Sequence, residues 1–269
     1  MAVIAIASAK GSPGVTTSAL AFTLSWSSRM LLAECDPAGG SALAGFLQGQ
    51  LPADRGLLPL AIAELRENGL AAAFRAQLVD LEPPHGRRLL LPGLTDPVQA
   101  GTLAPLWSRL ALFFTELEYA DPPGDVIVDC GRLAAEHVPW PLLDAADAVL
   151  LAVRPTLASV APAVPVASAL TRRLQEALGS SSSLGLLVIG EGPYGTREIA
   201  AGLVLPVVAS VPEDRRAASV LTNGGVVKSR SRFMRAAAGA EASVRQFIGR
   251  HRQIVPRRPV LKEISGGTI

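Results

Sequence analysis

A short stretch near the N-terminus, AKGSPGVTTSAL at residues 9–20, has the residue types of a phosphate-binding loop. It follows an apolar run at 2–8 that predicts a strand, and a helical pattern begins near Val15. Backbone N–H groups at the start of such a helix favour an anion, and glycines allow close approach. The usual loop has a lysine directly before its hydroxyl residue, whereas this chain has Val15 there and a lysine only at Lys10. The alternative interpretation is an ordinary turn between a strand and a helix.

Two carboxylates follow later apolar runs, at Asp36 and Asp129. The carboxyl ends of parallel strands form the edge at which open α/β sheets bind ligands. Asp129 at the end of VIVD is placed to hold Mg²⁺, often through water, and Gly131 lies where a γ-phosphate sensor is expected. Asp36 is placed to orient water or a hydrated metal, or alternatively to cap a helix. Arg132 either faces phosphate or is a surface charge.

Short, nearly continuous apolar runs alternate with helical patterns along most of the chain. Strands are expected near 2–8, 30–35, 87–91, 125–130, 147–153, 184–189 and 204–211. Helical patterns lie between them, and in the pattern at 156–178 Pro162 and Pro165 predict a helix confined to the later part. The alternation predicts an α/β fold with a doubly wound, mostly parallel β-sheet flanked by helices.

Composition limits the class of protein. The chain has 269 residues, 49% of them hydrophobic, and a mean hydropathy of +0.34, which excludes disorder for most of its length. No apolar run approaches the roughly 18 residues that span a bilayer, so no transmembrane segment is expected. The first residues form a strand and not a signal peptide. Cys35 and Cys130 show no metal-ligand spacing, which favours a reduced cytoplasmic protein with both thiols buried.

The β–α alternation stops near residue 225. We therefore expect a nucleotide-binding domain at 1–225, with a basic helix and tail of the same domain at 226–269. The latter segment carries ten Lys and Arg against two Glu, a net charge of +8, whereas the rest of the chain carries −6. Residues 231–252 show an apolar stripe at helical spacing, flanked by arginines. This helix either docks on the sheet with a solvated basic face or holds non-specific DNA or an anionic membrane.

The three motifs in this order resemble one family, the ParA/MinD-type ATPases with a deviant phosphate loop. KGSPGVTT at 10–17 matches the family's first motif, ECDPAGG at 34–40 its second, and VIVDCG at 126–131 its third. LVLPVVASVPEDRRAASVLTNG at 203–224 resembles the late segment that lies against the adenine. The resemblance covers about residues 1–225. It implies the P-loop NTPase fold, ATP or ADP with Mg²⁺ as cofactors, and a homodimer.

The resemblance also implies roles for individual residues. Lys10 would reach across the dimer to the partner's nucleotide and, with Asp36, would serve catalysis. Mg²⁺ would be held by Thr16, Asp36 and Asp129. The nucleotide would contact Lys10, Gly11, Ser12, Pro13, Gly14, Val15, Thr16, Thr17, Gly131, Pro212, Glu213 and Asp214.

Val15 is the main departure from that family. Losing a charge-assisted contact to phosphate costs on the order of 1.5–3 kcal/mol. Ser12 and Pro13 also stiffen the loop. We therefore expect a nucleotide-dependent dimeric switch with weak or absent ATPase activity, which positions another assembly through a protein partner. Short relatives with this loop look like the CpaE/TadZ-type proteins of pilus or secretion systems, so recruitment to a pole, membrane or nucleoid is an expectation. The alternatives are a pseudo-ATPase scaffold that needs no nucleotide, and a partition ATPase that binds DNA through 226–269.

Overall fold

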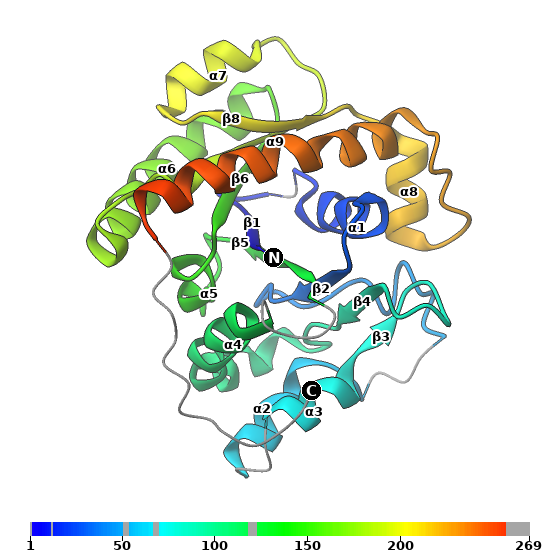
Figure 1. Ribbon diagram of the computed structural model, residues 1–269. Helices are drawn as coiled ribbons and strands as arrows, with labels where there is room; N and C mark the ends of the chain where they lie inside the picture. The colour runs from blue at the N-terminus through cyan, green and yellow to red at the C-terminus, as the bar shows by residue number, and fades with distance from the viewer. Residues whose placement is uncertain (1, 12, 51–53, 67–69, 118–122, 257–269) are drawn as a thin grey trace.

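The structure is a computed structural model, and it describes residues 2–11, 13–50, 54–66, 70–117 and 123–256 (Figure 1). Within these ranges the strands form one eight-stranded sheet in the order β3-β4-β2-β5-β1-β6-β7-β8. The strands are β1 (Val3–Ser8), β2 (Met30–Glu34), β3 (Val79–Asp80), β4 (Arg88–Leu91), β5 (Asp125–Arg132), β6 (Ala148–Val153), β7 (Leu184–Ile189) and β8 (Val207–Val211). The pairings are parallel apart from that of β3 with β4. The predicted fold class is confirmed.

The strand pattern of the sequence locates seven of these strands within a few residues. The largest difference is β8, which begins at Val207 and not at 204. The sequence analysis missed β3, because a strand of two residues leaves no apolar run to detect. The missed strand lies at the edge of the sheet and far from β1 in the strand order.

Helices cover both faces of the sheet, as expected for a doubly wound fold (Figure 1). The helices are α1 (Val15–Ser25), α2 (Leu57–Leu65), α3 (Leu70–Gln77), the 3-10 helix η1 (Pro97–Leu103), α4 (Ala104–Glu116), α5 (Trp140–Asp144), α6 (Leu157–Leu178), α7 (Thr196–Leu203), α8 (Arg215–Asn223) and α9 (Arg232–Ile254). Alternate residues of β1 point to opposite faces of the sheet. Ile4 and Ile6 pack with residues of α1, α8 and α9 on one face, and Val3 and Ala5 pack with residues of α4, α5 and α6 on the other. None of the helices in the described ranges is long and apolar enough to cross a bilayer.

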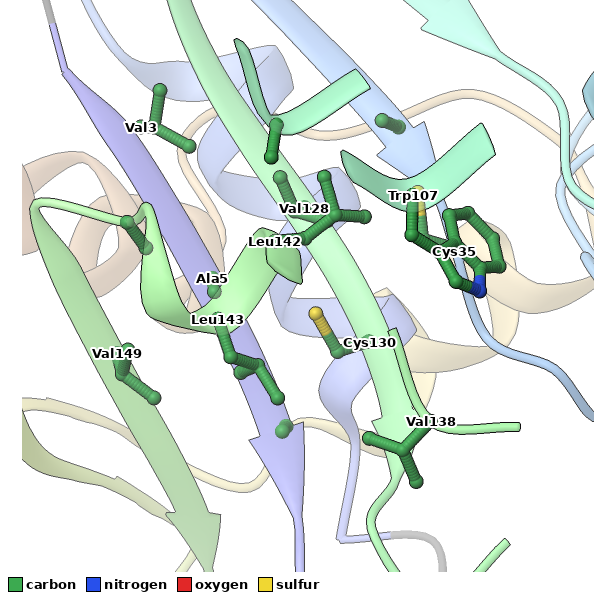
Figure 2. Close-up of a cluster of buried hydrophobic side chains, with 14 of the residues drawn as sticks. Val3, Ala5, Cys35, Trp107, Val128, Cys130, Val138, Leu142, Leu143 and Val149 are labelled. Carbon is green, nitrogen blue, oxygen red and sulfur yellow. The ribbon is translucent and has the colours of Figure 1, made fainter. Parts of the chain in front are cut away.

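The two cysteines lie in the core on the second of these faces. Cys35 directly follows β2, and Cys130 lies in the adjacent strand β5. Both are buried near Trp107 and Leu142 (Figure 2). Burial raises the pKa of both thiols well above the usual value, so both stay protonated. The expectation that both cysteines are small buried hydrophobic residues is confirmed.

Helix α6 differs from the prediction. It runs without interruption from Leu157 to Leu178 and includes both Pro162 and Pro165, so the expectation that they confine it was wrong. The buried residues Ala163, Ala167, Leu170 and Leu174 form a stripe that begins directly after Pro162 and continues past Pro165. Burial of that stripe on the sheet outweighs the lost backbone hydrogen bonds. Pro165 is exposed and Pro162 half-buried, so water can satisfy the freed carbonyls.

Helix α9 is an integral part of the core. Its buried stripe packs on the sheet beside α1, and the indole N–H of Trp26 donates to the carbonyl of Ala237 at 2.9 Å. Three of its arginines are paired: Arg232 with Glu191, Arg245 with Asp125 and Glu241, and Arg252 with Asp147. Arg235 and Arg250 are exposed and form no ion pair within the described ranges. The docked-helix interpretation is confirmed, and much of the basic character serves internal contacts.

The pairing of Arg245 yields a stability prediction. Its guanidinium lies 2.7 Å from a carboxylate oxygen of Asp125, whose side chain is 3% exposed. We expect Arg245→Ala to lower the free energy of unfolding by about 1–3 kcal/mol, because a buried acceptor loses its charged donor. Arg250→Ala, an exposed arginine on the same helix, is the matched control and should change it by less than about 0.5 kcal/mol. Equal effects of the two changes in urea unfolding would contradict a structural role for the pair.

Candidate functional site

The glycine loop connects β1 to α1 at the carboxyl edge of the sheet. Gly14 directly precedes α1 with φ of 118°, a conformation that residues with a Cβ rarely adopt. Gly11 also has positive φ and is exposed, so its backbone is accessible to a ligand. The predicted loop is therefore present at a helix N-terminus, where backbone N–H groups attract anions. Ser12 lies outside the described residues.

Thr16, in the first turn of α1, contacts Asp129 of β5, the strand that pairs with β1. The Thr16 hydroxyl donates to Asp129 Oδ2 at 2.5 Å, and the Gly131 N–H donates to Asp129 Oδ1 at 2.9 Å. They are 113 residues apart in sequence and come together because β5 pairs with β1, which leads into α1. A hydroxyl and a carboxylate side by side are the oxygen ligands that Mg²⁺ takes from proteins.

Asp36 joins this group from the end of β2. A Cβ placed on Gly131, whose φ is +62°, would overlap the Asp36 carboxylate, so only glycine permits this approach. The Ala38 N–H donates to Asp36 Oδ1 at 2.8 Å, within a turn closed by the Gly39 N–H on the Asp36 carbonyl. No helix begins in residues 37–50, so the alternative of a helix cap was wrong.

The sequence analysis assigned no function to Glu34, and the structure gives it one. This buried carboxylate accepts backbone N–H groups from Ser41 and Ala42 at 2.9 Å and from Gly93 at 3.3 Å. It therefore fixes the loop after Asp36. The position of Glu34 in the motif at 34–40 did not indicate this role. The three N–H donors belong to loops that only the tertiary structure brings together.

The carboxylates at this edge lie close enough to influence one another: in addition to burial, Glu34 and Asp36 both raise the pKa of Asp129. Burial raises the pKa of Asp129 from 3.8 to about 7, although the hydrogen bonds from Thr16 and Gly131 oppose the rise. Burial likewise raises the pKa of Glu34 and of Asp36, and Arg132 partly offsets the rise at Asp36. A divalent cation would favour the ionised form of each group.

Two cavities meet at the glycine loop. The first, of about 370 Å³, is lined by Gly11 and residues 13–17 of the loop, and by Asp36, Gly131 and Arg132. The second, of about 290 Å³, is lined by the β8–α8 connection, Pro212 to Arg215, and by Ser18, whose buried hydroxyl has no partner in the described structure. Pro13, Gly14, Thr17, Arg154 and Thr222 line both. The predicted phosphate and base residues thus border two adjacent cavities that share these five residues.

The remaining predicted site residues do not all border the two cavities. Lys10 is exposed and lines neither cavity. Val15, the first residue of α1, is 6% exposed and packs into the core on that face of the sheet. It also lines the first cavity, at the predicted phosphate end. Asp214 caps α8 by accepting from the Ala217 N–H at 3.0 Å. The sequence analysis missed Arg154, which follows β6; its place after a predicted parallel strand was the available signal.

The site fits a magnesium nucleotide by the chemistry of its donors. Thr16 and Asp129 offer oxygen ligands, and the α1 N-terminus offers backbone donors. Within the described residues, no three His, Cys, Asp or Glu side chains form a metal-binding group. In nucleotide sites Mg²⁺ takes one or two protein ligands and completes its shell with phosphates and water, and Thr16 and Asp129 are ligands of that kind.

The sheet order and the loop at its carboxyl edge match the fold of solved MinD and ParA-family structures. No family model matches the chain, and no curated protein matches its sequence. Among solved structures, it is similar to MinD from Pyrococcus horikoshii complexed with Mg-ADP, with TM-score 0.68, 15% identity, and coverage of 93% of this chain and 98% of that one.

Two further solved structures share the fold. A ParA family ATPase from Chlorobium tepidum has TM-score 0.64 and 14% identity, covering 90% of this chain and 97% of that one. Cobyrinic acid a,c-diamide synthase from Mycobacterium smegmatis, with a bound ATP analogue and magnesium, has TM-score 0.62 and 21% identity, covering 92% and 95%. At these identities the similarity establishes the fold.

Proposed function

We propose that the chain is a ParA/MinD-type switch that binds Mg²⁺ with ATP or ADP and forms a homodimer when ATP is bound. The observation that carries the proposal is the pair of adjacent cavities between the glycine loop and the β8–α8 connection, with Thr16, Asp129 and Gly131 joined by hydrogen bonds at one end. Two proteins of the same fold have been solved with Mg-ADP and with an ATP analogue and magnesium.

Each group has a role that follows from its position. Backbone N–H groups at the start of α1 bind the phosphates, and Thr16 and Asp129 hold the metal. Bound Mg²⁺ supplies positive charge to the phosphate oxygens. Asp36, beside Gly131, orients the water or the metal's hydration shell, and Pro212 to Asp214 contact the base.

Weak or absent hydrolysis follows from Val15, because phosphoryl transfer depends on charge stabilisation at the position where other P-loops have lysine. Lys10 is exposed at the loop, which suits a contact with a second subunit. A switch of this kind positions a cellular assembly through a protein partner, and the sequence resemblance favours a pilus or secretion system. The alternative is a scaffold that dimerises without nucleotide. A DNA-binding role would depend on Arg235 and Arg250, the exposed arginines of α9 that form no ion pair within the described residues.

Binding and size measurements test the proposal. We expect isothermal titration to show Mg²⁺-dependent ATP and ADP binding, and light scattering to show a dimer with ATP and a monomer with ADP. Lys10→Ala should keep ATP binding within about threefold and lose the dimer, because its charge serves the partner's site. Lys228→Ala, an exposed lysine that borders neither cavity, is the matched control and should keep both.

Two results would exclude this function. No detectable binding of either nucleotide at millimolar concentration would leave the nucleotide-independent scaffold. A dimer of the same stability with and without nucleotide would exclude the switch even if ATP binds. For the DNA alternative, substitution of Arg235 and Arg250 is the informative change, since deleting residues 226–269 removes α9 from the core.

A further inference from the structure

The predicted phosphate end of the site lacks the positively charged side chain that a P-loop usually offers to the phosphates. The residue where P-loops usually have lysine is Val15, and its side chain is 6% exposed and packs with the apolar residues of the α1 face. Three carboxylates, Glu34, Asp36 and Asp129, lie at the adjacent strand ends. A nucleotide would bring several more negative charges, so a cation from elsewhere in the chain is needed there.

Three cations near the loop are available to meet this need. Lys10 borders neither cavity. Arg132 borders only the phosphate end and is exposed, and its charge acts on Asp36 by lowering the pKa of that carboxyl. Arg154 borders both cavities together with Gly14 and Thr17, so it lies where the phosphates and the rest of a nucleotide would join.

The backbone of Arg154 is fixed, whereas its guanidinium is only loosely held. Its N–H donates to the Ser159 hydroxyl at 2.9 Å, and its carbonyl accepts from the Thr156 N–H at 2.8 Å. The guanidinium lies 3.9 Å from a Glu213 carboxylate oxygen, and both side chains are 41% exposed. An ion pair of this length and exposure is weak, so a phosphate can replace Glu213 as the partner of Arg154.

We propose that Arg154, from the end of β6, supplies to the nucleotide phosphates the positive charge that P-loops usually take from a lysine at the position of Val15. The inference rests on the nucleotide binding proposed above. Arginine suits this role because its planar group donates two parallel hydrogen bonds to phosphate oxygens. Arg154 is a binding residue of the same subunit, in contrast to Lys10, which serves the partner.

The dependence of affinity on phosphate number tests this role. We expect Arg154→Ala to weaken Mg²⁺–ATP binding about 10- to 100-fold in isothermal titration, as loss of a charged phosphate contact does. Adenosine binding, followed by competition with a fluorescent ATP analogue, should change by less than about threefold, because adenosine has no phosphate for Arg154 to contact. Arg154→Gln keeps the length and polarity of the side chain without its charge, and it should show the same loss if Arg154→Ala folds poorly. Arg172→Ala, an exposed arginine of α6 that borders neither cavity, is the matched control.

A rescue experiment connects Arg154 directly to the missing lysine. Val15→Lys in the Arg154→Ala background should restore ATP affinity by about tenfold or more, whereas in the wild-type background it should add less, because the two cations serve the same charge. Val15→Met changes the packing at this position without adding charge, and it should restore nothing.

The outcomes separate the two proposals. If the wild type binds ATP and Arg154→Ala binds it equally well, the inference fails and the nucleotide-binding function stands. If the wild type binds neither ATP nor ADP, both fail. An equal loss of ATP and adenosine binding would make Arg154 a general structural residue, and a loss confined to Arg132→Ala would assign the charge to Arg132. Both results would overturn the inference.

Discussion

Gly131→Ala is expected to lower the free energy of unfolding by about 2–4 kcal/mol and to weaken Mg²⁺–ATP binding at least tenfold. The new methyl group would overlap the Asp36 carboxylate, and the positive φ of 62° is strained for alanine. Asp36 cannot turn aside without losing the hydrogen bond from the Ala38 N–H. Urea unfolding and isothermal titration measure the two effects.

Gly179→Ala separates backbone strain from the steric overlap. Gly179 has a similar φ of 72°, but a Cβ there meets no atom within 4 Å, so alanine should cost only about 1 kcal/mol. Adding Asp36→Ala to Gly131→Ala removes the overlapping carboxylate and should restore part of the stability. If Gly131→Ala and Gly179→Ala cost the same, Asp36 and Gly131 are not in contact as described.

Asp129→Asn is expected to stabilise the metal-free and nucleotide-free protein at pH 8 by about 1–3 kcal/mol relative to the wild type. Burial raises the folded-state pKa of Asp129 to about 7, above the value of 3.8 for an exposed carboxyl. The folded wild type therefore binds a proton that the unfolded chain has lost, and its stability falls as the pH rises from about 4 to 7. Asparagine keeps the size of the side chain and its ability to bond Thr16 and Gly131 without this penalty.

The difference in unfolding free energy between the two proteins isolates this group, because the other titrating groups are common to both. From pH 5.5 to pH 8 it should shift in favour of Asp129→Asn by about 2 kcal/mol, at 1.36 kcal/mol per pKa unit. Saturating Mg²⁺–ATP should reverse the order at pH 8, because the metal needs the ionised carboxylate. A difference that stays flat with pH would show that Asp129 is already ionised in the folded state.

The two predictions concern the same small volume, where Asp36, Gly131 and Asp129 meet at the ends of β2 and β5. Gly131→Ala places a methyl group where the Asp36 carboxylate lies, and Asp129→Asn removes a charge that the fold holds out of water. Opposite signs of the stability change are therefore expected from neighbouring residues, and this result would be difficult to obtain from a site without such close contact.

The sequence by itself determined the fold class and the edge at which the motifs meet. Buried parallel strands read as continuous apolar runs, such as VIAIA and DVIVDC, so their number and places follow from local composition. The motif residues follow these runs directly, and all parallel strands end at one edge, so Thr16, Asp36 and Asp129 were expected together. The stripe on α9 was also visible, because burial of one helix face imposes its own spacing.

Only the tertiary structure decided what depends on contacts between distant segments. Sheet order brings Arg154 to the phosphate cavity and the Gly93 N–H to Glu34, and no local pattern encodes either. Packing of Ala163 to Leu174 on the sheet keeps α6 intact through two prolines, against their intrinsic preference. The role proposed for Arg154 in place of a lysine at Val15 depends on the same kind of contact, since a guanidinium acts through space and not through its place in the chain.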